Sequence, residues 1–232
     1  MITRRTLTYC GAACLLRHGI AHSQPSSDSA VLSKTYGCHL PLRAAASYVG
    51  KAEGAKLILT GHEDLVSHSA SIMFDYAFAQ TLARLCQAFQ VRPGFSYYRE
   101  PSEDPQNAYA TEQRIISESD GTVLFGLNML GALLARSQNG PVSVIAVAAH
   151  EFGHIVALKR GFQSQLAPDA THPFRSEQFA DYMSGYFSGI RRRNNPNFPA
   201  SDFAMTFRDM AGTSQGTHGT REERGEAIAR GT

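Results

Sequence analysis

The sequence His150-Glu151-Phe152-Gly153-His154 lies inside an apolar run from Val142 to Leu158, and this feature constrains the fold more than any other. A run of this length and character predicts a helix that is buried on most sides. On a helix, residues four apart lie about 40° apart around the axis and about 6 Å along it, so both imidazoles can reach one metal ion. We therefore predict a buried helix that carries two metal ligands, His150 and His154.

Glu151 directly follows the first of these histidines. Its carboxylate is too close in sequence to be a third ligand, but it is well placed to take a proton from a water molecule on the metal. The alternative is a core helix in which two hydrogen-bonded histidines flank an unrelated glutamate. Composition alone predicts roughly 0.02 chance occurrences of the pattern in this chain, which favours the metal site.

A catalytic zinc site needs a third protein ligand and an open fourth position. Glu177 is the candidate, 23 residues after the second histidine, in the segment Ser176–Gly185 that we predict to be a helix. Asp181 lies one turn further on, so Glu177 can bind the metal while Asp181 accepts the outer N–H of a ligand histidine. Ala180 and Gly185 would let the two helices pack closely. The alternative for this acidic pair is a solvated helix face.

The two motifs together resemble the gluzincin metallopeptidases, whose signature is HExxH followed by Glu-x-x-Ala-Asp. Both halves are unbroken here, the second as Glu177-Gln178-Phe179-Ala180-Asp181. Asn107–Ala110 and Gly121–Leu127 are similar to the segment that precedes the zinc helix in that family, where it forms the active-site edge strand and the following helix. The resemblance covers roughly residues 105 to 230.

A third segment near the C-terminus, Gly216–Arg224, strengthens the resemblance. It is similar to the Thr-His-x-x-x-x-x-Arg element of membrane-linked CaaX-protease-like and heat-shock proteases, and of the bacterial neutral zinc metallopeptidases. Its histidine, His218, is our candidate for the donor that stabilises the oxyanion during catalysis. A role in supporting a metal ligand or in structuring the loop is equally compatible with this position.

The resemblance implies an α+β, mostly helical, zincin-like metallopeptidase domain. Such a domain has an active-site helix, a second ligand-bearing helix and a small sheet whose edge strand binds the substrate. We expect a protein or peptide substrate to add as an extended strand along Gly121–Gly126, because an open sheet edge can pair with an extended peptide.

For the activity, the site residues and the resemblance both indicate a zinc-dependent endopeptidase. One Zn²⁺ ion per chain would be held by His150, His154 and Glu177, which leaves a position open for water. Glu151 would act as the general base and take the proton from that water as it attacks the peptide carbonyl.

The first 23 residues contain no acidic residue and are predicted to be an export signal. Thr3-Arg4-Arg5-Thr6-Leu7 resembles a twin-arginine signal, the stretch from Leu7 to Leu16 supplies the apolar region, and Ala21-His22-Ser23 offers small residues before a cut near Gln24. Ten apolar residues are too few to span a bilayer, and we expect no transmembrane segment elsewhere. The protein should therefore be periplasmic or secreted and act on exported or envelope proteins; the alternative is membrane anchoring by an uncleaved signal.

Removal of this signal changes the charge and the cysteine content. Without Arg4, Arg5 and Arg17, 19 basic residues remain against 20 acidic ones, so the formal charge is −1. That balance gives no electrostatic case for binding nucleic acid. Cys38 and Cys86 remain, and an oxidising compartment favours a disulfide between them.

The rest of the chain is long enough for one compact domain with a substantial core. We expect a polar lead over residues 24–34 and a single metallopeptidase domain over residues 35–232, of open oligomeric state. The expected elements outside the site are helices at Pro41–Val49, Ile72–Phe89 and Leu127–Ala135, strands at Val91–Tyr98 and Thr122–Gly126, and a strand or helix end at Lys56–Thr60.

Other functional classes share parts of this pattern. A zinc-stabilised binding or scaffold module would keep the metal ligands but has no use for a glutamate directly after the first histidine. A non-peptidase zinc amidohydrolase of the cell envelope would share every catalytic residue, and only its substrates would distinguish it. A peptidase held inactive by its own N- or C-terminal segment is a variant of the endopeptidase interpretation.

Overall fold

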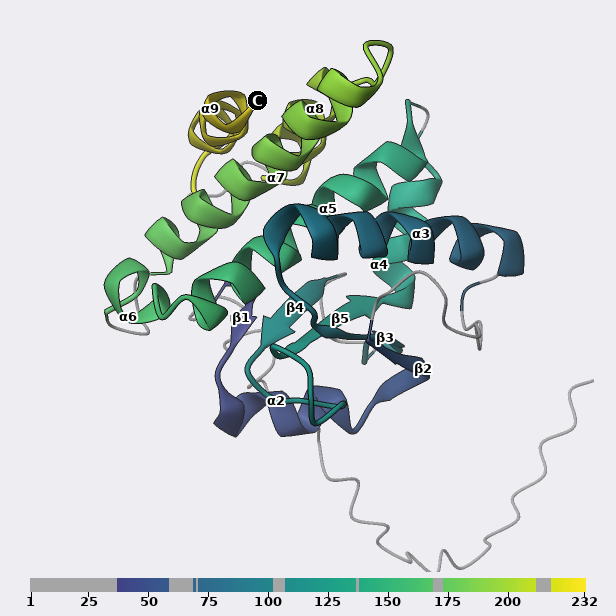
Figure 1. Cartoon of the computed structure of the whole chain (residues 1–232), viewed down its shortest axis with the longest axis vertical. Coiled ribbons are helices and arrows are strands. Elements are labelled where there is room, and N and C mark those ends of the chain that lie inside the picture. The colour runs from purple at the N-terminus through teal and green to yellow at the C-terminus, as the bar shows by residue number, and fades with distance from the viewer. Residues whose placement is uncertain are drawn as a thin grey trace, which may run out of the picture.

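A small mixed sheet with helices on both faces forms the centre of the fold (Figure 1). The structure is a computed structural model that describes residues 37–58, 69, 71–101, 107–136, 138–168, 173–211 and 218–232. The predicted export signal and polar lead lie outside these residues. Within them the fold is α+β and mostly helical, which confirms the coarse fold class.

Five strands make up the sheet, in the order β1-β4-β5-β3-β2. The central strand β5 pairs antiparallel with β4 on one side and parallel with β3 on the other. The outer strands are β1, parallel to β4, and β2, antiparallel to β3. The strand bounds are His39–Leu40 for β1, Ala52–Ile58 for β2, Gly94–Tyr98 for β3, Ala108–Thr111 for β4 and Thr122–Gly126 for β5.

Helix α2 covers one face of the sheet, while α3, α4 and α5 cover the other, with α7, α8 and α9 packed beyond α5 (Figure 1). The short α6 lies between α5 and α7 in the chain. The helix bounds are Leu42–Val49 for α2, Ile72–Phe89 for α3, Leu127–Leu134 for α4, Gly140–Lys159 for α5, Gln163–Leu166 for α6, Phe174–Asn194 for α7, Ser201–Met210 for α8 and Arg221–Gly231 for α9.

Side chains that alternate along the strands divide the core into two parts, as the period-2 geometry of a strand requires. On β5, Val123 and Phe125 belong to the large core under α3, α4 and α5, whereas Leu124 belongs to the small core under α2. Tyr109 on β4 joins Leu124 in the small core, and Tyr48 of α2 packs edge-on against it. Both faces of the sheet are therefore buried.

Most of the elements expected from the sequence are present close to their predicted bounds. Helix α3 matches Ile72–Phe89, and strand β5 matches Thr122–Gly126. The α3 N-terminus is capped by Ser71, whose hydroxyl accepts the Phe74 N–H at 3.3 Å. The segment predicted as a strand or helix end at Lys56–Thr60 belongs to strand β2 as far as Ile58, and its last two residues lie outside the described residues.

The expected position of the substrate-binding edge strand is wrong. Residues 122–126 form β5, which is paired on both sides and offers no open edge. The hydrophobic pattern located this strand correctly, but the order of strands in a sheet depends on long-range pairing that the pattern does not contain.

Helices α5 and α7 pack closely, although only in part through the residues expected. A Cβ added at Gly153 of α5 would lie 2.9 Å from the Ala180 Cα of α7, so a glycine is needed at this crossing. Ala180 therefore acts as predicted. Gly185 does not, because it lies against the backbone of Ile228 in α9.

The expectation of no membrane-length segment needs correction for α5. Among the described residues, Gly140–Lys159 is long and apolar enough to cross a bilayer, with a mean hydropathy of 1.5. However, 78% of this window is buried inside the protein, which is the environment of a core helix. Length and apolar composition alone do not distinguish a membrane-spanning helix from a buried core helix.

Candidate metal centre

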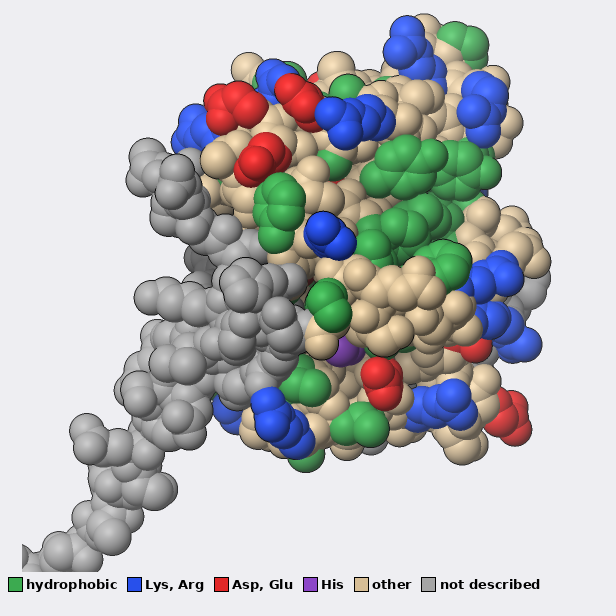
Figure 2. Space-filling view, turned by 90° about the vertical axis from the view of Figure 1, so that its left-hand side faces the viewer, with side chains coloured by type: hydrophobic (Ala, Val, Ile, Leu, Met, Phe, Trp, Pro, Cys, Tyr) green, Lys and Arg blue, Asp and Glu red, His purple; other side chains and the backbone are tan. Residues whose placement is uncertain are grey.

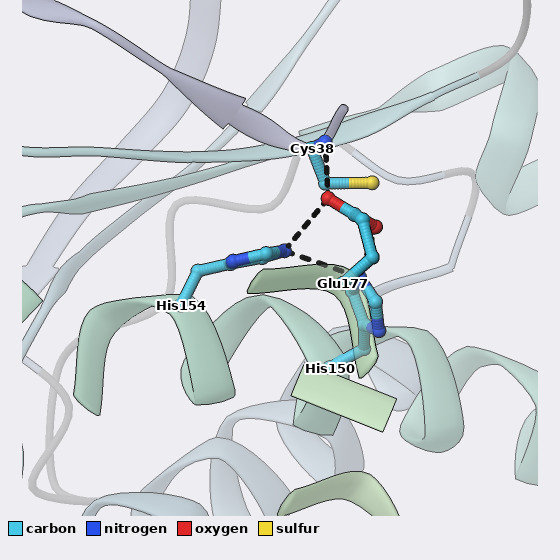
Figure 3. A group of neighbouring side chains, drawn as sticks. All are labelled: Cys38, His150, His154 and Glu177. Carbon is cyan, nitrogen blue, oxygen red and sulfur yellow. Dashed lines mark hydrogen bonds and ion pairs between the residues drawn. The ribbon is translucent and has the colours of Figure 1, made fainter. Parts of the chain in front are cut away.

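Helices α5 and α7 bring His150, His154 and Glu177 together, as the sequence predicts (Figure 3). His150 Nε2 lies 3.2 Å from His154 Nε2 and 3.2 Å from Glu177 Oε2. His154 Nε2 lies 3.3 Å from Glu177 Oε1. The two histidines are one helical turn apart on α5 and the carboxylate faces them from α7, so three donor groups converge on one point.

These side chains are withdrawn from solvent. His150 and Glu151 are each 1% exposed, and His154 and Glu177 are fully buried. On the face drawn in Figure 2, histidine side chains contribute only a small area of surface. A buried cluster of histidines and carboxylates is costly unless its charges are compensated, which indicates a functional or metal-binding role.

Asp181 lies where the sequence predicts it, behind His150. Its Oδ1 is 2.8 Å from His150 Nδ1, so the carboxylate accepts the outer N–H and leaves Nε2 directed at the centre. Arg224 of α9 holds this carboxylate with two hydrogen bonds of 2.8 Å, from Nε to Oδ2 and from Nη2 to Oδ1. Ligand orientation thus depends on a buried chain of three residues from three helices.

The electrostatics of the cluster favour a positive charge at its centre. Burial opposes protonation of His150, but its hydrogen bonds to Asp181 and Glu177 dominate and raise its pKa to about 10. Burial would raise the pKa of Glu177, yet the facing histidines, His218 and His154 foremost, hold it well below its usual value. Burial lowers the pKa of His154, so its imidazole is neutral. Glu177 and His154 are therefore in the forms that bind metals, whereas His150 must release a proton when a metal binds.

Glu151 is a buried carboxyl group without a full set of partners. Among the described residues its Oε2 has no hydrogen-bond partner, although a buried polar atom normally has one. Burial is the main cause that raises the pKa of Glu151 to about 8, with His150 opposing the rise. A carboxyl group with a raised pKa beside a metal site is suited to taking up and returning a proton.

His218 lies beside the cluster. Its Nδ1 is 2.6 Å from Glu177 Oε2, and its side chain is 27% exposed. This contact joins it to a candidate ligand, in keeping with the supporting role left open by the sequence. Because the His218 side chain is only half buried, it is also compatible with the predicted role as oxyanion donor.

Cys38 is the member of the site that the sequence analysis missed. One ligand atom from each of Cys38, His150, His154 and Glu177 lies within 4.8 Å of every other, and the Cys38 N–H donates to Glu177 Oε1 at 2.9 Å (Figure 3). The predicted disulfide is wrong, because neither Cys38 nor Cys86 forms a disulfide, although both are buried. Cys86 belongs to α3, whereas Cys38 precedes β1.

No spacing rule could have found Cys38, because it lies far from both motifs in the chain and has no second ligand near it in sequence. Arg224 had a signal, since it ends the Thr-His-x-x-x-x-x-Arg element, but that pattern does not reveal its partner. The cluster as a whole could hold a metal ion. Comparisons of this chain with protein-family models, curated proteins and solved structures find no match.

Proposed function

We propose that this protein is a zinc-dependent endopeptidase with a gluzincin-like site. The observation that carries the proposal is the spacing of the three donor groups. Zinc binds histidine nitrogen at about 2.0–2.1 Å and carboxylate oxygen at about 2.0–2.2 Å, so adjacent donors of a tetrahedral site lie about 3.3 Å apart. The three distances among His150, His154 and Glu177 are 3.2, 3.2 and 3.3 Å.

The types of donor also fit zinc. Two imidazoles and one carboxylate form a set typical of catalytic zinc, with a fourth position open to water or substrate. Calcium and magnesium prefer six or more oxygen ligands, which this cluster does not offer. His150 donates its Nδ1–H to the Asp181 carboxylate, and metal-binding histidines commonly have such a carboxylate partner.

The proposed reaction uses the chain's own groups as follows. Zinc, when bound, would act as a Lewis acid that lowers the pKa of water, so that hydroxide is available to attack a carbonyl near neutral pH. Glu151 accepts a proton at its carboxylate and returns it to the departing amine. His218 is in reach of the same space and can donate a hydrogen bond to the developing oxyanion. Asp181 and Arg224 keep the imidazole of His150 oriented.

The substrate would bind as an extended peptide, but not on β5. Strand β4 contacts the active-site helix α5, and its outer edge is paired only with the two-residue strand β1, at Ala110 and Thr111, so this edge is the better candidate for strand addition.

A second candidate is a zinc-stabilised binding module, favoured by one observation. With Cys38, the cluster contains four protein donors, the number typical of structural zinc sites. Against this stands the unpaired, buried Glu151 oxygen, which a purely structural site does not need. The non-peptidase amidohydrolase remains distinguishable only by its substrates.

The test compares zinc content and peptide cleavage in the full chain and in Glu151→Gln. Because Cys38 lies against the site, each is also prepared with Cys38→Ser. Cleavage is followed with casein and a quenched peptide library. We expect about one zinc per chain in all four proteins, and cleavage only where Glu151 is intact. Zinc-loaded proteins that cleave nothing in either Cys38 background would refute the peptidase proposal.

A further inference from the structure

The chain segment Gly37–Leu40 runs from the candidate metal centre, where Cys38 contacts Glu177, into the sheet. The Cys38 carbonyl accepts the Ala110 N–H at 2.9 Å, and His39 and Leu40 then pair with Ala110 and Thr111 as strand β1. This segment therefore occupies part of the outer edge of β4. That edge is the one on which the proposed function places an extended substrate.

The backbone of this segment also fits closely against a metal ligand. The Cys38 N–H donates to Glu177 Oε1 at 2.9 Å, in a buried contact. Gly37 has a φ of 61°, and a Cβ at this position would collide with Glu177 Oε1. Only glycine combines that backbone conformation with so close an approach. The segment is thus shaped to the site and does not merely pass near it.

The thiol of Cys38 completes the donor set. Its side chain is 7% exposed, and its sulfur lies 3.9 Å from His218 Nδ1. Zinc–sulfur bonds are about 2.3 Å long, so sulfur and nitrogen donors of one tetrahedral site lie about 3.6 Å apart. The four donor atoms lie within 4.8 Å of one another, a limit about 1.2 Å longer than this, so the Cys38 thiol would have to turn toward the metal in order to bind it.

We propose that Gly37–Leu40 is an internal inhibitor of the peptidase. In the closed state the Cys38 thiolate is the fourth metal ligand, which removes the position needed by water, and β1 covers the edge of β4. On coordination the thiol proton passes to water, and no group is oxidised or reduced. Activity requires the segment to leave, through cleavage of the chain or displacement of the thiol. This inference rests on the proposed function for its inhibitory part, but not for the coordination of Cys38.

Burial of the ligands supports the closed state. His150, Glu151, His154 and Glu177 are at most 1% exposed, so a peptide cannot reach them while the segment is in place. A catalytic zinc site keeps an open position, whereas four protein ligands close it.

The first measurement is the absorption spectrum of the full chain loaded with Co²⁺, which replaces Zn²⁺ in such sites. A thiolate ligand gives a charge-transfer band in the near ultraviolet, and the visible bands report the metal site itself. We expect the charge-transfer band in the unmodified chain and in Cys86→Ala, the matched cysteine control in α3. We expect Cys38→Ser to lose this band and to keep the visible bands.

The second measurement is kcat/KM on the quenched peptide library with zinc bound. If at least about 90% of the molecules are in the closed state, Cys38→Ser should raise kcat/KM by at least about tenfold, because the remaining molecules become active. Cys86→Ala should leave kcat/KM unchanged. Alkylation of Cys38 should be slower with zinc than after chelation, because a coordinated thiolate is protected.

The outcomes separate this inference from the proposed function. A Co²⁺-loaded chain without the charge-transfer band overturns it, whatever the activity. A band together with equal cleavage by the unmodified chain and Cys38→Ser overturns the inhibitory part and makes Cys38 a permanent ligand. A band with no cleavage by either protein refutes the peptidase and its inhibition together, and leaves a closed structural site.

Discussion

The buried link from Arg224 through Asp181 holds His150, the first proposed ligand, in place. Asp181 accepts the imidazole N–H at 2.8 Å and receives two hydrogen bonds from the guanidinium. Both side chains are almost fully buried, so neither charge can be stabilised by water if the other is removed. Their effect on the centre should appear as a change in metal affinity and not only in stability.

Asp181→Asn should weaken zinc binding by about 10–100-fold, the range found when outer-shell partners of ligand histidines are removed. The amide keeps the size of the side chain but loses the negative charge that favours His150 as a donor. Competition with a chromophoric chelator measures the change. Asp209→Asn, which alters an exposed ion pair with Arg136, is the matched control and should bind zinc normally. Equal affinities in both variants would contradict this role for Asp181.

Gly37→Ala tests the inhibitory segment without changing the thiol. The added methyl group must displace the backbone from Glu177, and the positive φ disfavours alanine as well. We expect a weaker thiolate band with Co²⁺ and a higher kcat/KM than in the unmodified chain. Gly161→Ala, also at positive φ but with open space around it, is the control for backbone strain alone. A Gly37→Ala protein with an unchanged band would show that the fit at this position does not matter.

At the residue scale, the predictable part of the site was the part with local spacing. His150, Glu151 and His154 share one helical turn, and Glu177 and Asp181 share another, so the period of the helix places each set. Cys38 enters from a distant segment by way of strand pairing. No periodicity relates it to the other residues of the site, and the sequence indicated a disulfide with Cys86 for it.

The crossing of α5 and α7 positions the ligands at the scale of whole elements. Two helices carry the three proposed zinc ligands, so their separation sets the distances within the centre. Gly153 lies inside the HExxH turn and faces Ala180 of α7. The small residues at this point allow the backbones to approach as closely as the ligand distances require.

Gly153→Ala should therefore disturb the centre although it adds a single methyl group. Its Cβ would lie 2.9 Å from the Ala180 Cα, a backbone atom that cannot move alone, so the helices must separate. We expect a loss of about 1–3 kcal/mol in the free energy of unfolding, together with weaker zinc binding. Urea denaturation and chelator competition measure the two effects.

The control for this substitution is Gly131→Ala in α4, where an added Cβ meets nothing within 4 Å. Alanine has the higher helix propensity, so this variant should be stabilised by about 0.5–1 kcal/mol. If Gly153→Ala were as stable as Gly131→Ala and bound zinc normally, close packing of the helices would not be needed for the site.

The elements themselves were largely predictable, whereas their arrangement was not. Ile72–Phe89 and Thr122–Gly126 carry clear hydrophobic patterns with turn or cap residues at their ends, and both have the predicted bounds. The two-residue strand β1 is too short to show any pattern. The pairing of β5 with both β3 and β4 places it at the centre of the sheet and not at the predicted edge.

Metal binding should matter for the stability of the whole molecule, because the donors come from the start of the fold and from two separate helices. A ligand that binds only the folded state stabilises it by RT ln(1 + [L]/Kd), about 4.1 kcal/mol at a thousandfold excess over Kd. We expect the Tm to fall when zinc is removed with a chelator. The Tm of His154→Ala should be lower and insensitive to the chelator. An unmodified chain with the same Tm in zinc and in chelator would argue against a metal centre.

The most direct test of the central claim is zinc K-edge X-ray absorption on the purified full chain. The account predicts one zinc ion with two nitrogen ligands at about 2.0–2.1 Å, one oxygen at about 2.0–2.2 Å and one sulfur at about 2.3 Å. The sulfur shell should disappear in Cys38→Ser, and a light-atom ligand should take its place. A chain that purifies without zinc, or zinc surrounded only by light atoms without the histidine signature, would contradict the account.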